Sequence, residues 1–135
     1  MSKHVFDKQA LIRLRLSNAR ETLKDAHDLF EGSGSARSIV NRSYYAMYYA
    51  TLALLVTVDR NPSKHTGIMS YFDKEFVKNN IVPKELSRML HKAFESRQEG
   101  DYTDPEQIDR KKASEILQSA DKFVNVIEQK LLEQP

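Results

Sequence analysis

Residues 44–58 read YYAMYYATLALLVTV, a run of fifteen residues without a charged side chain. A helix that is apolar on every side belongs in a protein interior, so this run predicts a buried central helix. It is shorter than the roughly 20 residues that a membrane-spanning helix needs. Arg42 stands just before the run and brings a cation to the edge of an apolar region, where it needs a partner or a ligand.

The rest of the chain also predicts helices, because apolar residues recur at spacings of three and four and no segment shows the alternation of a strand. We therefore expect a single all-α domain over residues 1–135, a mostly antiparallel bundle of about five helices with the second helix central. The predicted helices cover residues 7–31, 35–58, 63–78 and 83–99, and a last helix starts at 105 or 106 after a turn-rich loop.

Several residues are typical of helix ends. Ser33 or Ser35 can cap the second helix, and Ser63 can cap the third. Pro83 fits the first position of the fourth helix, and the asparagines at 79 and 80 end the third.

Composition narrows the function classes. The chain has no cysteine, which excludes thiol catalysis, disulfides and thiolate metal sites. The histidine and glutamate spacings of helical metal sites and the glycine-rich phosphate loop do not occur, so we expect no metal and no cofactor. The formal net charge is only +2, with both signs mixed along the chain, unlike a protein with a general affinity for DNA. The first residues lack the apolar stretch of a secretory signal, so we expect a cytoplasmic protein.

The second helix carries the first candidate site residues. Arg42, Tyr45 and Tyr49 have the spacing i, i+3 and i+7, which predicts that they lie along one face of the helix. Such a face offers a guanidinium group for phosphate or carboxylate, with phenols beside it as donors. The alternative is structural: Arg42 pairs with a carboxylate of another helix and the tyrosines simply pack.

Two later segments add candidates. His65 lies at the predicted start of the third helix, where it can act as acid, base or donor, or can be an exposed residue of the helix cap. Arg97 ends the fourth helix and is followed by Asp101 and Tyr102. Arg97 can complete an anion site, or it can neutralise the helix C-terminus and pair with Asp101.

Three segments together resemble the small stand-alone prokaryotic branch of the HEPN domains, a name that stands for higher eukaryotes and prokaryotes nucleotide-binding. The segments are NRSYYAM at residues 41–47, KHTGI at 64–68, and Arg97 with Asp101–Tyr102. The resemblance extends over nearly the whole chain. It implies a bundle of about five helices, usually a homodimer, and a frequent partnership with a minimal nucleotidyltransferase as a toxin–antitoxin pair.

The resemblance also implies a chemistry, because many members of the wider superfamily are metal-independent endoribonucleases. Their motif is an arginine followed four to six residues later by a histidine on the same helix, and in the stand-alone branch that histidine is commonly one turn further along. In this sequence Arg42 is kept, but Tyr49 stands where the branch most often has histidine. A phenol with a pKa of about 10 is a poor general base at neutral pH, although it can donate a hydrogen bond.

The first hypothesis is thus a non-catalytic HEPN-type module that binds nucleotide or RNA phosphate as a partner of a nucleotidyltransferase. The alternative is a metal-independent endoribonuclease that uses Arg42 and His65 as catalytic residues. A third hypothesis is a protein that only interacts with its partner. The predicted ligand-binding residues are Arg42, Tyr45, Tyr49, His65, Arg97, Asp101 and Tyr102.

Overall fold

The described part of the chain is helical throughout. The computed structural model describes residues 7–60, 62, 64–102 and 109–133, and only the backbone of residues 99–102. The helices are α1 (Lys8–Glu31), α2 (Ala36–Val56), α3 (His65–Phe72), α4 (Lys84–Tyr102) and α5 (Arg110–Leu132), and a π-helical turn, η1 (Asp73–Val77), continues α3. No strand occurs among these residues, so the predicted all-α fold is confirmed.

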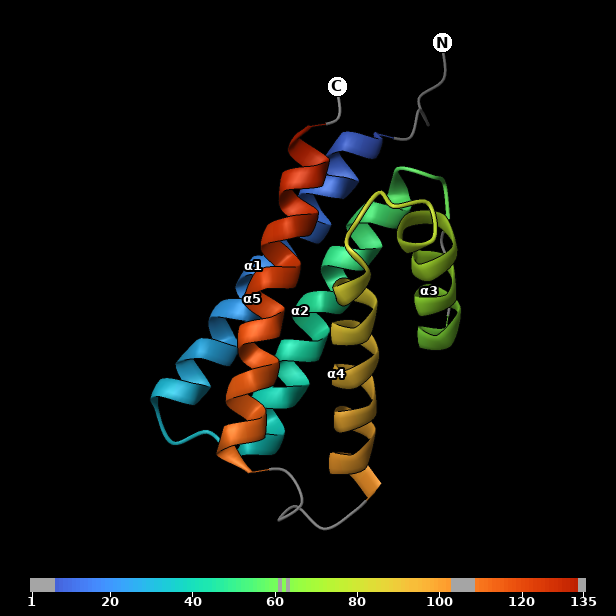
Figure 1. Ribbon diagram of the computed structural model, residues 1–135. Helices are drawn as coiled ribbons and strands as arrows, with labels where there is room; N and C mark the ends of the chain where they lie inside the picture. Colours follow the sequence, from blue (N-terminus) through green and yellow to red (C-terminus); the bar gives the residue numbers. More distant parts are fainter. Residues whose placement is uncertain (1–6, 61, 63, 103–108, 134–135) are drawn as a thin grey trace.

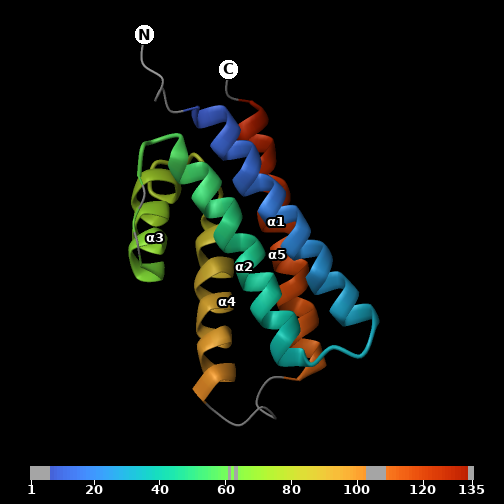
Figure 2. The same cartoon turned by 180° about the vertical axis from the view of Figure 1, so that it is seen from behind.

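Four long helices form an antiparallel bundle in which consecutive long helices run in opposite directions (Figure 1). α2 contacts α1, α3, α4 and α5, which confirms that the second helix is central. The short α3 lies beside the C-terminal half of α2 and also contacts α4 (Figures 1 and 2). Seen from behind, α2 lies in front of α5, between α1 on one side and α3 and α4 on the other (Figure 2).

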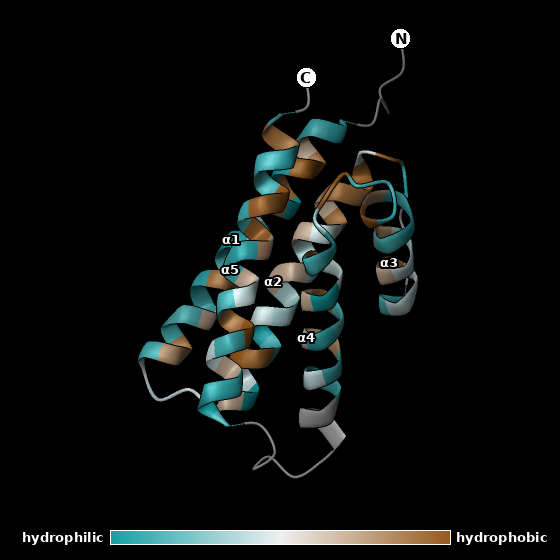
Figure 3. Cartoon of the chain, viewed as in Figure 1, coloured by the Kyte–Doolittle hydropathy of each residue, from teal (hydrophilic) through white to brown (hydrophobic). Residues whose placement is uncertain are grey.

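The core is built around α2, as the uncharged run at residues 44–58 predicts. Tyr44, Met47 and Leu54 are completely buried on this helix, and Phe72 and Phe123 pack against each other with ring centroids 5.5 Å apart. The upper part of α2 is uniformly hydrophobic, whereas α1, α4 and α5 alternate hydrophobic and hydrophilic residues (Figure 3). Only one face of each surrounding helix is therefore buried, while α2 is buried over most of its circumference.

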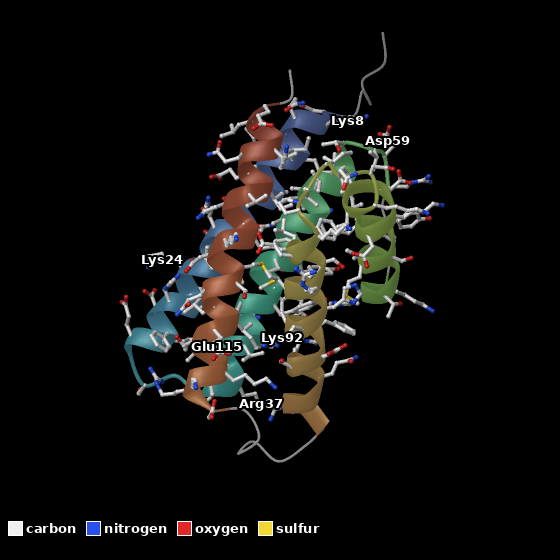
Figure 4. All side chains as sticks on the ribbon, in the orientation of Figure 1. Lys8, Lys24, Arg37, Asp59, Lys92 and Glu115 are labelled. Carbon is white, nitrogen blue, oxygen red and sulfur yellow. The ribbon has the colours of Figure 1, made fainter. Side chains whose placement is uncertain are left out.

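Ion pairs and hydrogen bonds connect the ends of neighbouring helices. Lys8 at the start of α1 forms an ion pair of 2.8 Å with Asp59, which follows α2, and the two side chains lie at the same end of the bundle (Figure 4). Arg110 donates hydrogen bonds to the carbonyl oxygen of Phe30, which the end of α1 leaves free, and to that of Gly34 in the turn that follows. None of the described helices is long and apolar enough to cross a membrane.

The N-cap of α2 is Ser35, whose Oγ accepts a hydrogen bond of 3.1 Å from the backbone N–H of Ser38. The sequence had left Ser33 and Ser35 as alternative N-caps of this helix. We expect Ser35→Ala to lower the free energy of unfolding by about 1 kcal/mol, because a helix N–H loses its acceptor. Chemical denaturation measures the change, with Ser33→Ala as the matched control. An equal loss in the two variants would contradict this assignment.

Several predicted helix ends need correction. α4 continues through Gly100 to Tyr102, so the turn-rich loop predicted from residue 100 is wrong there, because a single glycine lowers but does not abolish helix formation. The last helix begins at Arg110 behind an extended Asp109, which caps it, and not at residue 105 or 106. The predicted cap Ser63 lies outside the described residues, and the observed N-cap of α3 is Lys64, without a side-chain hydrogen bond. Pro83 lies just before α4.

Candidate functional site

Four tyrosines of α2 form a continuous aromatic cluster. The ring centroids are 5.2 Å apart for Tyr44 and Tyr45, 5.6 Å for Tyr45 and Tyr48, and 5.7 Å for Tyr48 and Tyr49. Tyr44 is completely buried, whereas the other three are half-buried. Tyr45 and Tyr49, which the sequence placed on one face, have centroids 6.3 Å apart. The three half-buried rings therefore leave part of the cluster open to solvent.

His65, the first residue of α3, packs into this cluster. Its imidazole stacks on Tyr48 at 4.6 Å between centroids and on Tyr44 at 5.7 Å, and it meets Tyr45 edge-on at 6.0 Å. Phe94 from α4 lies at 6.1 Å from the same ring. The His65 Nδ1 atom and the Tyr44 hydroxyl form a hydrogen bond of 2.5 Å. His65 is consequently a half-buried, fixed residue and not the exposed capping residue of the structural alternative.

Two guanidinium groups flank Tyr45. The Cζ atom of Arg42 lies 5.6 Å from the centroid of the Tyr45 ring, and the Cζ atom of Arg97 lies 5.2 Å from it. Arg97 is also 5.6 Å from the centroid of Tyr44. These distances are typical of cation–π contacts. Arg42 from α2 and Arg97 from α4, the two arginines predicted as site residues, thus meet at the ring of Tyr45.

Neither arginine has a carboxylate partner among the described side chains. Arg42 donates from Nε and from Nη2 to the side-chain oxygen of Asn41, at 3.3 and 2.9 Å. The Nε atom of Arg97 is buried without a hydrogen-bond partner. The structural alternative, in which Arg42 pairs with a carboxylate of another helix, is therefore not what these residues show. The side chains of Asp101 and Tyr102 lie outside the described residues, although the backbone of both belongs to α4.

Burial and neighbouring charge shift the pKa values of His65, Tyr44 and Tyr48. Burial, and to a smaller extent the charge of Arg97, lowers the pKa of His65 below its usual value. Burial raises the pKa of Tyr44 and of Tyr48, so both phenols keep their protons at neutral pH. Because the imidazole and these two phenols are neutral, the positive charge beside them comes from arginines: Arg42 and Arg97 at Tyr45, and Arg15 near Tyr48. No group of three or more potential metal ligands occurs among the described residues.

Sequence comparison gives the family. The family model described as "HEPN domain" matches residues 12–130. The chain belongs to the HEPN family. A "UPF0332 protein" of Thermotoga maritima is 36% identical over 127 residues, which are 94% of this chain and 95% of that protein.

Two further relatives of this HEPN chain come from Methanocaldococcus jannaschii, and each bears the name "Putative toxin". One is 34% identical over 110 residues, which are 82% of this chain and 74% of the relative. The other is 34% identical over 125 residues, which are 93% of this chain and 89% of the relative.

The HEPN chain has no histidine on α2, and the imidazole beside its arginines comes from α3. Residues 46–49, which follow Arg42 by four to seven positions, are Ala-Met-Tyr-Tyr. Within the described part of the chain, the Tyr49 ring contacts the rings of Tyr45 and Tyr48 but not His65 or either arginine.

Sequence reasoning missed three residues of the cluster, Tyr44, Tyr48 and Phe94. The sequence does place Tyr44 and Tyr48 one turn apart, and this i, i+4 spacing could have indicated a second aromatic pair beside the Arg42 face. Helical spacing can place Phe94 on the inward face of the fourth helix, but it cannot show that its ring reaches Tyr44, at 5.7 Å between centroids.

Proposed function

We propose that this HEPN protein is a toxin-type module that binds nucleotide or RNA through phosphate groups on the tyrosine face of α2. The observation that carries the proposal is that the Arg42 and Arg97 guanidinium groups flank Tyr45 without a carboxylate partner among the described side chains. A cation near an apolar interior is costly unless an anion or hydrogen-bond acceptors compensate it. A phosphate group would supply both.

The residue types fit this ligand class. A guanidinium group binds phosphate through parallel N–H donors, and aromatic rings stack with the bases of single-stranded RNA. In this proposal Arg42 and Arg97 hold the phosphate, and His65, Tyr45 and Tyr49 orient it. From the sequence we expect Asp101 to position one of the arginines and Tyr102 to lie beside the phosphate. The low net charge of +2 argues for a local site and against a general affinity for nucleic acid.

The proposal includes an assembly. Helices α1 and α2 lie side by side and are long enough to offer a surface to a second copy (Figure 2). We propose a homodimer of this kind, partnered by a minimal nucleotidyltransferase in a toxin–antitoxin pair. The names of the two archaeal relatives support the toxin assignment. Sedimentation of the purified chain tests the dimer, and co-purification with the product of the neighbouring gene tests the pair.

The binding proposal is tested with Arg42→Ala. Fluorescence anisotropy of a labelled single-stranded RNA should show an affinity at least about tenfold lower than that of the wild type, because a charge-assisted contact to phosphate is lost. The far-UV circular dichroism and melting temperature should stay unchanged. Arg20→Ala is the matched control, since Arg20 lies on α1 and pairs with Glu128 at 2.5 Å, away from the tyrosine cluster. A lower melting temperature with unchanged affinity would reject the proposal.

A second candidate function is a metal-independent endoribonuclease with Arg42 stabilising the developing charge and His65 as acid or base. The contact of His65 with the cluster that holds both arginines favours it. Incubation of RNA with the wild type and with His65→Ala in EDTA separates the two functions. Cleavage by the wild type that is lost in the variant supports the enzyme. RNA binding without cleavage in either protein supports the binding module.

A further inference from the structure

The two ring nitrogens of His65 have different surroundings. Nδ1 lies 2.5 Å from the hydroxyl oxygen of Tyr44, a completely buried residue. Nε2 forms no hydrogen bond with any described residue, and it is not one of the buried unpaired polar atoms. Nδ1 is therefore directed into the protein, whereas Nε2 remains accessible to a ligand.

The chemistry of Tyr44 decides which nitrogen carries the proton. Burial raises the pKa of this phenol, so Tyr44 keeps its proton throughout the neutral range. The only hydrogen-bond partner of its hydroxyl among the described residues is Nδ1 of His65. A buried hydroxyl donates where an acceptor is available, and Nδ1 can accept only through its lone pair. The single N–H of a neutral imidazole must then be on Nε2.

We propose that Tyr44 is a positioning residue that holds His65 in the Nε2–H tautomer, so that His65 presents a hydrogen-bond donor, and not a base, to the ligand of this site. Stacking on Tyr48 and on Tyr44 and the edge-on contact with Tyr45 fix the plane of the ring. From α4, Phe94 closes the apolar side. The nearby positive charge of Arg97 opposes a second proton on the imidazole.

This inference rests on the proposed function for its ligand and narrows that ligand to a class. A neutral N–H donor beside two guanidinium groups suits the non-bridging oxygen atoms of a phosphate diester, which only accept hydrogen bonds. A general base would instead need a free lone pair on the accessible nitrogen. His65 thus contributes to binding and orientation in the same way as the arginines, through donated hydrogen bonds.

The tautomer is tested by long-range proton–nitrogen correlation spectra of the ¹⁵N-labelled protein above pH 7, with His65→Gln identifying the His65 signals among the four histidines. The wild type should show an unprotonated Nδ1 and a protonated Nε2. In Tyr44→Phe the titration midpoint of His65 should rise, because the hydrogen bond that favours the neutral ring is gone. A protonated Nδ1 in the wild type, or an unchanged midpoint in Tyr44→Phe, would overturn the assignment. These spectra need no RNA, so they stand apart from the test of the proposed function.

The donor role is tested by comparing His65→Gln with His65→Leu in the RNA anisotropy assay. The glutamine amide replaces the N–H donor but cannot exchange a proton, so its RNA affinity should stay within about threefold of the wild type. The leucine keeps apolar packing without a donor and should lose about tenfold. Equal affinity losses in the two variants, or none in either, would overturn the donor role. Absence of RNA binding by the wild type would instead reject the proposed function.

Discussion

Replacing Arg97 with methionine is expected to remove most RNA binding without lowering the stability of the fold. The Nε atom of Arg97 is buried without a hydrogen-bond partner, and a buried unpaired N–H costs about 1–3 kcal/mol. Methionine keeps much of the side-chain length and removes this cost, while it also removes two cation–π contacts that are worth about 0.5–1 kcal/mol each. The two changes nearly cancel, so the free energy of unfolding should stay constant or rise.

The loss of RNA affinity should be larger than for any other single substitution in the site, about a hundredfold, because Arg97 reaches both Tyr44 and Tyr45 and is only partly solvated. The slope of log affinity against log salt concentration should fall by about 0.7, the value for one phosphate contact to single-stranded nucleic acid. Anisotropy titrations at several salt concentrations measure both quantities.

Lys92→Met is the matched control for Arg97→Met. Lys92 lies on α4 as well, but its side chain is exposed (Figure 4). Its loss should change RNA affinity by less than about threefold, since an exposed cation away from the ligand contributes little at physiological salt. If Arg97→Met instead unfolds the protein and Lys92→Met does not, Arg97 has a structural role and the binding site must be placed elsewhere.

The largest loss of stability is expected for Leu54→Ala in the centre of α2. Leu54 is completely buried, so the substitution removes buried apolar groups and leaves a cavity, which together cost about 2–5 kcal/mol. For a chain of this length the melting temperature should fall by about 10 °C or more. Thermal and urea unfolding, followed by circular dichroism, measure the change.

Leu132→Ala is the matched control for Leu54→Ala, because the same atoms are removed from a residue that is 71% exposed at the end of α5. The free energy of unfolding should change by less than about 0.5 kcal/mol in this variant. Similar losses in the two leucine variants would mean that α2 is not the centre of the core.

Helix positions could be predicted from the sequence more reliably than helix ends. The start of α1 at Lys8 and the start of α2 behind Ser35 agree with the predicted ends to within one residue, because a capping side chain marks each of them. The fourth helix was predicted to end at residue 99, just before a glycine that α4 in fact passes through. The predicted third helix holds a change of helix type, since α3 gives way to the π-helical turn at Asp73, and hydrophobic spacing does not reveal such a turn.

Helical geometry alone could relate candidate site residues to one another only within one helix, and His65 and Arg97 were grouped with them through the family resemblance. Arg42, Tyr45 and Tyr49 share a face because helical geometry alone relates them, and the structure shows them as neighbours. Tyr44 and Tyr48 belong to the site because their rings stack with His65, which comes from another helix, α3.

The sequence by itself determined that this protein is all helical, that the second helix with its uncharged run at residues 44–58 lies at its centre, and that Arg42 stands just before that run. Local spacing and burial preference are enough for those conclusions, because they depend on the periodicity of one segment. Only the tertiary structure decided that His65 from α3 and Arg97 from α4 meet the tyrosines of α2. That meeting depends on how three helices pack and rotate against one another, and this packing results from side-chain fit across the whole core.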